Sequence, residues 1–177
     1  VNVFAGVDPA TDSQRRDADF SVIMVVAVDE DNNLYVLDYI KKRGIPVLGI
    51  TGESTKGIVD YIFEMNNIYH PSLFTIEDTS MSKPVMQALM SEMRRINNFG
   101  VNFKAEKPGT RMSKRDRIQG VLSARFSTGQ IHIKKDDYDL RQEILTFGPR
   151  MAHDDCIDAL AYAAKYSYPL KGINEEK

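Results

Sequence analysis

The chain has 177 residues, of which 42% are hydrophobic and 27% charged, and its net charge is -2 at pH 7. These values are typical of a globular protein of one domain and exclude collagen-like, coiled-coil and disordered classes. The single Cys156 excludes an internal disulfide and a multi-cysteine zinc site, which favours a reducing, intracellular setting. The longest apolar stretch, at residues 22–28, is far shorter than the ~20 residues of a membrane-spanning helix.

The first third of the chain predicts three strands, at residues 2–7, 20–28 and 34–40. The second of these is a long run of β-branched residues, typical of a strand that is buried on both faces. A polar loop at about 10–19 and a turn at 29–33 join the three runs, so we expect an antiparallel meander.

Helices and strands then alternate. The periodicity and the capping residues predict a helix at 54–67, a strand at 73–77, helices at 82–97 and 113–128 around a strand at 101–105, a short strand at 131–133, and helices at 139–147 and 153–166. The fold class is therefore α/β, with a central mixed sheet whose first three strands are antiparallel and whose later strands are parallel, flanked by helices. We expect a single domain over residues 1–177, with a folded core at about 1–168 and a tail at 169–177.

The charge is unevenly distributed. Residues 94–135 contain eleven Lys or Arg and two acids, a net charge of +9, whereas the rest of the chain carries -11. A polyanion could bind the basic region, and acids outside it could hold metal cations. The alternative is a solvated surface of mixed charge.

Two carboxylates end predicted strands. Asp8 closes the first strand and Glu77 closes the strand at 73–77. Because sites of open α/β sheets form at such ends, the two acids converge if their strands are neighbours. The alternatives are a turn role for Asp8 before Pro9, and a solvated strand end or helix cap at Glu77 and Asp78.

The start of the last predicted helix carries three further acids, Asp154, Asp155 and Asp158. On a helical wheel they occupy one flank, beside an apolar stripe of Ile157, Leu160, Ala161 and Ala164 that we expect to pack on the sheet. One acid suffices for a helix cap, and three repel one another unless a cation lies among them. Clustered carboxylates suit Mg²⁺ or Mn²⁺, and two such ions can promote phosphodiester hydrolysis.

These segments resemble the nuclease domain of tailed-bacteriophage large terminase subunits, in the RNase H-like superfamily. The similarity covers residues 3–166 and includes Gly-Val-Asp-Pro-Ala at 6–10, Glu77 after its strand, and Lys-Arg-Asp-Arg-Ile at 114–118. Its most specific part is His-Asp-Asp-Cys-Ile-Asp-Ala-Leu at 153–160.

The resemblance implies an RNase H-like fold and a metal-dependent endonuclease that cuts concatemeric viral DNA during genome packaging. Asp8 and Glu77 match the first two metal-binding acids. The third is Asp155 or Asp158; the resemblance favours Asp155, and spacing alone favours Asp158. Asp19 and Asp78 are secondary candidates, and His153 is interpreted as a helix-start residue. The implied cofactor is Mg²⁺ or Mn²⁺, with two ions expected.

The implied partners are double-stranded DNA, the terminase ATPase domain, the small terminase subunit and the portal, in the host cytoplasm and with no membrane. We expect the basic region to contact DNA phosphates without reading sequence. The candidates are Lys107, Arg111, Lys114, Arg117 and Arg125. The alternative for these side chains is a solubilising surface.

A phosphate-binding loop of the form Gly-x-x-x-x-Gly-Lys-Ser/Thr is absent from this sequence, so we expect that the ATPase motor is not part of the chain. A first residue other than Met agrees with a piece of a longer protein. The same absence disfavours a sugar-kinase-like ATPase. Two alternatives stay open: a Holliday-junction-resolvase-like nuclease of the same fold, and a non-catalytic DNA-binding or docking module.

Overall fold

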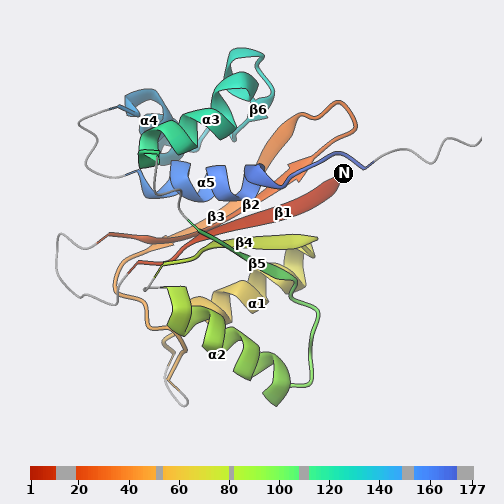
Figure 1. Ribbon diagram of the computed structural model, residues 1–177, viewed down its shortest axis with the longest axis vertical. Coiled ribbons are helices and arrows are strands. Elements are labelled where there is room, and N and C mark those ends of the chain that lie inside the picture. The colour runs from red at the N-terminus through yellow and green to blue at the C-terminus, as the bar shows by residue number, and fades with distance from the viewer. Residues whose placement is uncertain (11–18, 51–53, 80–81, 108–111, 149–153, 171–177) are drawn as a thin grey trace, which may run out of the picture.

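A six-stranded mixed sheet forms the centre of the molecule, with the strand order β5-β4-β1-β2-β3-β6 (Figure 1). The computed structural model describes residues 1–10, 19–50, 54–79, 82–107, 112–148 and 154–170. The strands are β1 (Asn2–Asp8), β2 (Ser21–Val28), β3 (Leu34–Lys42), β4 (Leu73–Glu77), β5 (Phe103–Glu106) and β6 (Ile131–His132). The helices are α1 (Ile58–Tyr69), α2 (Ser82–Arg95), α3 (Lys114–Ser127), α4 (Tyr138–Thr146) and α5 (Asp155–Lys165).

The strand directions confirm the predicted topology. β1, β2 and β3 form an antiparallel meander, whereas β4 pairs with β1, and β5 with β4, in parallel. β6 lies parallel to β3 at the other edge of the sheet. The helical connections of the second half carry the chain back to the same end of the sheet, which makes these later strands parallel.

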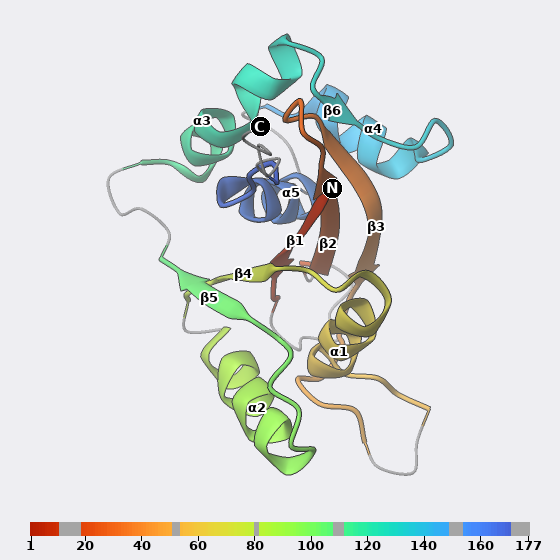
Figure 2. The ribbon, with the colours of Figure 1, turned by 90° about the vertical axis from the view of Figure 1, so that its right-hand side faces the viewer.

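Helices cover both faces of the sheet. α1 and α2 lie against one face, while α5 lies against the other and is itself covered by α3 and α4 (Figures 1 and 2). Every residue of β2 is buried because it is covered on both sides. Because successive side chains of a strand point to opposite faces, the strands contribute residues to two apolar clusters, one on each face of the sheet.

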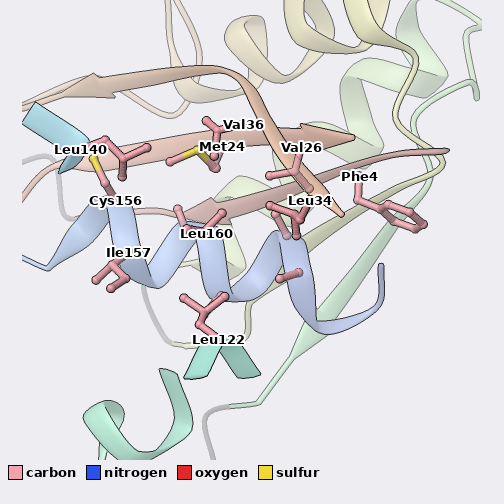
Figure 3. Packing of buried hydrophobic residues seen from close by; sticks show 14 of the residues in the cluster. Phe4, Met24, Val26, Leu34, Val36, Leu122, Leu140, Cys156, Ile157 and Leu160 are labelled. Carbon is pink, nitrogen blue, oxygen red and sulfur yellow. The ribbon is translucent and has the colours of Figure 1, made fainter. Parts of the chain in front are cut away.

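α5 approaches β1 closely because small residues meet there. A methyl group added at Gly6 would lie 2.0 Å from the carbonyl oxygen of Ala159 and 2.5 Å from the amide nitrogen of Ala163. All residues of α5 from Asp155 to Ala164 are buried, because the sheet covers one side and α3 and α4 cover the other (Figure 3).

The predicted orientation of α5 was therefore wrong in part. Ile157 does not lie between α5 and the sheet but lines an apolar cavity of about 410 Å³ with Ile118 and Leu122 of α3. The residues against the sheet at Gly6 are Ala159 and Ala163. A helix covered on two sides has two apolar faces, so the wheel could not show which one meets the sheet.

Two helices begin two or more residues later than the sequence predicts. α1 begins at Ile58 rather than at residue 54, because the amide groups of Ile58 and Val59 donate to the carbonyls of Pro46 and Val47, 2.9 and 3.1 Å away. α5 begins at Asp155 rather than at 153, and His153 lies outside the described residues. In the part of the chain that the structure describes, no helix has the length and apolar character needed to cross a membrane.

Candidate functional site

Asp8 and Glu77 lie side by side at one end of the sheet. β1 and β4 are neighbouring parallel strands, and Val7 is paired with Ile76, so Asp8 and Glu77 follow in register. Val7 and Ile76 belong to the apolar cluster beneath α1 and α2. Because side chains alternate along a strand, Asp8 and Glu77 point to the other face, toward α5. The convergence expected from the sequence is thus present.

The first turn of α5 adds Asp155 and Asp158 to this pair. Their exposed fractions are only 5% and 1%. Burial is the largest cause that raises the pKa of Asp8 well above its usual value, and the negative charges of Asp158, Glu77 and Asp155 raise it further. The four carboxylates therefore form one electrostatically coupled cluster, which we call the acidic cluster.

Two cations from α3 lie against the acidic cluster. Lys114 Nζ is 2.8 Å from Asp154 Oδ1 and 3.1 Å from Asp158 Oδ2. Arg117 Nη2 is 2.9 Å from Asp158 Oδ1 and 3.9 Å from Glu77 Oε1. Both cations were predicted to contact DNA phosphates, and the structure places them on the carboxylates.

The pKa shifts show how strongly these charges interact. Burial is the largest single influence and lowers the pKa of Lys114 and Arg117. The charge of Asp158 and the neighbouring acids together exceed it, so the pKa of each cation is raised. Burial also raises the pKa of Asp155, against the charge of Lys114 and a hydrogen bond from the backbone of Phe20, which lower it. The cations thus partly offset the cost of burying several acids together.

Tyr162 of α5 connects the two sides of the acidic cluster. Its hydroxyl donates to Glu77 Oε1 at 2.9 Å, and the guanidinium of Arg117 lies 4.6 Å from the centre of its ring. These contacts hold Glu77 and Arg117 in place. Tyr162 cannot be identified from the sequence, because nothing in its local pattern distinguishes it from an apolar residue of the helix.

Glu143 of α4 holds the start of α5. Its Oε1 accepts a hydrogen bond of 2.8 Å from the amide of Ile157, and its Oε2 is 3.1 Å from Lys41 Nζ. The N-cap residue Asp154 makes no side-chain capping bond of its own. Glu143 therefore satisfies a first-turn amide of the helix that carries Asp155 and Asp158. The sequence offered no signal for this role, since the contact joins two different helices.

The donor chemistry of the acidic cluster fits a hard divalent cation. All four side chains supply oxygen, and their mutual repulsion would be relieved by positive charge. Asp158 Oδ1 is buried and accepts no hydrogen bond, although Arg117 Nη2 lies close to it. Among the described residues, no group of three or more His, Cys, Asp or Glu side chains is arranged to hold a metal ion. Lys114 and Arg117 supply part of the positive charge that offsets the acids.

The remaining predicted site residues are more dispersed. Lys107 is exposed. It follows Glu106, which is the residue of β5 opposite Glu77 of β4 in the sheet. Arg125 lies two turns beyond Arg117 and donates to Asn32 Oδ1 and Ser167 Oγ, each at 2.9 Å, so it joins two surface segments away from the acidic cluster. Arg111 lies outside the described residues.

Two secondary candidates border the acidic cluster. The negative charge of Asp19, which is exposed, raises the pKa of Asp155. Asp78 follows Glu77, and its amide donates to the carbonyl of Glu106 at 2.7 Å. Neither side chain joins the four carboxylates that interact at Asp8.

The fold and the acidic cluster define a class: the chain is a nuclease domain of RNase H-like fold. Residues 5–166 match the family model described as the terminase RNaseH-like domain. The chain therefore belongs to the terminase RNase H-like domain family.

Solved structures support the fold. The chain is similar to T. thermophilus RuvC in complex with a Holliday junction substrate, with 19% identity, coverage of 92% of this chain and 90% of that chain, and a TM-score of 0.50. The yeast mitochondrial Holliday junction resolvase Ydc2 matches with 10% identity, coverage of 90% and 76%, and a TM-score of 0.54. The fowlpox virus Holliday junction resolvase matches with 13% identity, coverage of 93% and 96%, and a TM-score of 0.50. A comparison with curated protein sequences finds no significant match.

Proposed function

We propose that this chain is an Mg²⁺- or Mn²⁺-dependent endodeoxyribonuclease that cuts concatemeric viral DNA during genome packaging. The observation that carries the proposal is the acidic cluster, in which four carboxylates from β1, β4 and α5 converge on one face of a sheet. Membership of the terminase RNase H-like domain family supports the packaging role.

Asp8, Glu77, Asp155 and Asp158 would hold the cations in this proposal. When bound, two divalent ions supply positive charge to the attacking and the leaving oxygen of a phosphodiester. Asp8 is central, because the other three carboxylates all act on its pKa. Tyr162 orients Glu77 through its hydroxyl, and Glu143 fixes the turn of α5 that carries the other two acids.

Cations of the basic region would bind the DNA backbone. Lys114 and Arg117 hold positive charge at the acidic cluster, where the phosphate to be cleaved must lie. Lys107, Arg111 and Arg125 would extend this contact to phosphates on either side. The ATPase domain, small subunit and portal are the proposed partners, and the host cytoplasm is the proposed location.

The test is cleavage of a supercoiled plasmid with Mg²⁺, with Mn²⁺ and with EDTA. We expect cleavage with either metal and none with EDTA. Asp8→Asn lowers the rate by about 10³-fold or more, because it removes a charge that the cations require. The matched control is Asp31→Asn, which alters an exposed acid in the turn after β2. Cleavage by folded Asp8→Asn at the parental rate contradicts the mechanism.

A resolvase is the second candidate, because two structural neighbours are named as Holliday junction resolvases and a third is in complex with a Holliday junction substrate. A four-way junction and a linear duplex of the same arm sequence separate the two functions. Preferential cutting of the junction supports a resolvase, and comparable cutting of both supports a packaging nuclease. Metal-independent binding of DNA, with no cleavage of either substrate, supports a docking module.

A further inference from the structure

Lys114 of α3 lies among the acids of the proposed metal site. Its Nζ is 2.8 Å from Asp154 Oδ1 and 3.1 Å from Asp158 Oδ2. Burial is the largest influence on the pKa of Asp8 and of Asp155 and raises both, whereas the charge of Lys114 lowers both. One ammonium group therefore acts on acids of β1 and of the first turn of α5, as a metal ion held by these acids would.

The carboxylate of Asp158 is where a protein cation and a metal ion would compete most directly. Its Oδ2 contacts Lys114 Nζ and accepts a hydrogen bond of 3.1 Å from Arg117 Nη2, while its Oδ1 lies 2.9 Å from the same Arg117 nitrogen. A divalent cation such as Mg²⁺ binds through the same carboxylate oxygens. Each ion pair with Asp158 therefore lowers the negative potential that attracts such a cation, and the effect is strong because this side chain is only 1% exposed.

The two protein cations differ in how firmly they are held. The side chain of Arg117 is 12% exposed, and its guanidinium lies 4.6 Å from the centre of the Tyr162 ring. The side chain of Lys114 is 43% exposed, and Asp154, its nearer partner, is 31% exposed. A lysine has a flexible four-carbon chain, so its ammonium can move from the acids into solvent while α3 stays in place. Lys114 is thus the cation that a metal ion can displace.

We propose that Lys114 is an internal counter-ion of the acidic cluster, which pairs with Asp154 and Asp158 until a divalent cation displaces it. The site then binds metal more weakly than its carboxylates alone would, because a metal ion must first break these ion pairs. The inference rests on the proposed nuclease function and adds regulation of the same site, since the position of one lysine side chain sets the affinity for metal.

The first test is the affinity for Mn²⁺ in the absence of DNA, measured by the electron paramagnetic resonance signal of unbound Mn²⁺. Lys114→Met keeps the length of the side chain and removes its charge, so we expect about 10-fold tighter binding. Lys114→Arg keeps the charge and should stay within about 3-fold of the parent. The hydroxyl of Ser113 caps α3 by accepting a hydrogen bond from the amide of Asp116, so neither substitution removes the start of the helix.

The matched control is Lys83→Met, which removes the same charge from an exposed position of α2. This lysine lies on the opposite face of the sheet and outside residues 94–135. The affinity for Mn²⁺ should stay within about 2-fold of the parent, because an exposed charge across the sheet is screened by solvent.

A second measurement follows the side chain of Lys114 itself. The NMR signals of its terminal nitrogen and carbon, assigned by their loss in Lys114→Met, report whether the ammonium is ion-paired. The metal is Mg²⁺, because it is diamagnetic. Adding it should move these signals toward the values of the exposed Lys83, assigned in the same way, and should leave those of Lys83 unchanged.

Three results overturn the inference and leave the proposed metal site standing. They are equal Mn²⁺ affinity in the parent and Lys114→Met, an equal gain in Lys114→Arg or Lys83→Met, and an unmoved Lys114 signal with Mg²⁺ bound. Absence of metal binding in all of these proteins overturns the metal site together with the inference. Neither measurement involves DNA cleavage, so a failure of the nuclease activity shows separately, in the plasmid test with Asp8→Asn.

Discussion

The two faces of the sheet differ in the side chains that they bury. The face beneath α1 and α2 is an apolar cluster that includes Val7, Ile23, Val25 and Leu89. The face beneath α5 also has an apolar cluster, but it carries all three buried acids of the described residues, Glu143, Asp155 and Asp158. Burying charge costs free energy unless it is paired, so the second face is less favourable for stability.

The difference indicates a division of roles. Apolar packing on the α1 and α2 face stabilises the sheet, and the sheet in turn holds strand ends at which acids can be brought together. On the α5 face, Lys41, Lys114 and Arg117 offset the acids by ion pairs rather than by removing their charge. Such an arrangement keeps negative charge available for a ligand.

The largest effect is expected where α5 meets the sheet. Gly6→Ala should destabilise the protein by at least about 3 kcal/mol, because the added methyl overlaps the backbone of Ala159 and Ala163. Urea unfolding measures the change. The matched control is Gly120→Ala in α3, where an added methyl meets nothing within 4 Å. It should stabilise by about 0.5–1 kcal/mol. Equal effects at both positions contradict the close approach.

A substitution on the apolar face should lower the free energy of unfolding without changing the cleavage rate. Leu89→Ala removes a fully buried side chain of α2 and should cost about 3 kcal/mol through the cavity it leaves. The metal-dependent cleavage rate, measured at a temperature where the variant is folded, should stay within about 2-fold of the parent, because no contact of Leu89 reaches the acidic cluster. A 10-fold slower rate in the folded variant means that the two faces are not independent.

The ion pairs of the two faces should differ in strength. Glu143→Ala leaves the amide of Ile157 without its partner and Lys41 unpaired, and should cost about 2 kcal/mol. Glu143→Gln keeps an acceptor for the amide, so a smaller loss is expected. The control is Glu64→Ala in α1, whose pair with Lys56 is exposed and should contribute less than about 0.5 kcal/mol. Similar losses for Glu143→Ala and Glu64→Ala, measured by urea unfolding, contradict the positioning role.

The smallest effect is a gain in stability at Asp8. Because its pKa in the folded protein is raised, the folded state binds more protons than the unfolded chain above about pH 4, and stability falls as the pH rises. Asp8→Asn should therefore stabilise the protein in EDTA at pH 7 by roughly 1 kcal/mol, or ~2–4 °C in Tm. The gain should disappear below about pH 3, where the parental carboxyl is protonated in both states. A loss of stability at pH 7 contradicts the assigned pKa direction.

Much of the fold could be predicted from local pattern. The β-branched run at β2, the turn between β2 and β3 and the alternation that follows were sufficient to predict the strands and their directions. The strand order was left open, since nothing in the sequence states that β4 joins β1 or that β6 joins β3. Helix starts depend on distant carbonyls, as at Ile58, and were placed less accurately.

The members of the acidic cluster could also be predicted from the sequence. They lie at the ends of strands and at the start of a helix, and such positions are expected to meet at one edge of an α/β sheet. In the structure the charges of Glu77, Asp155 and Asp158 all raise the pKa of Asp8. The residues that support them could not be predicted. Glu143 and Tyr162 act through contacts between elements that are far apart in the chain. Such contacts produce no periodic pattern or motif in the local sequence.

The close approach at Gly6 also distinguishes two parts of the site. β1 and α5 are packed backbone to backbone at Gly6, so Asp8, Asp155 and Asp158 stand on two elements that are in direct contact. α3, by contrast, borders a cavity of about 410 Å³ where it meets α5. Lys114 and Arg117 therefore come from a helix that is packed less closely than the elements carrying the acids, so the two kinds of charge in the site rest on different parts of the fold.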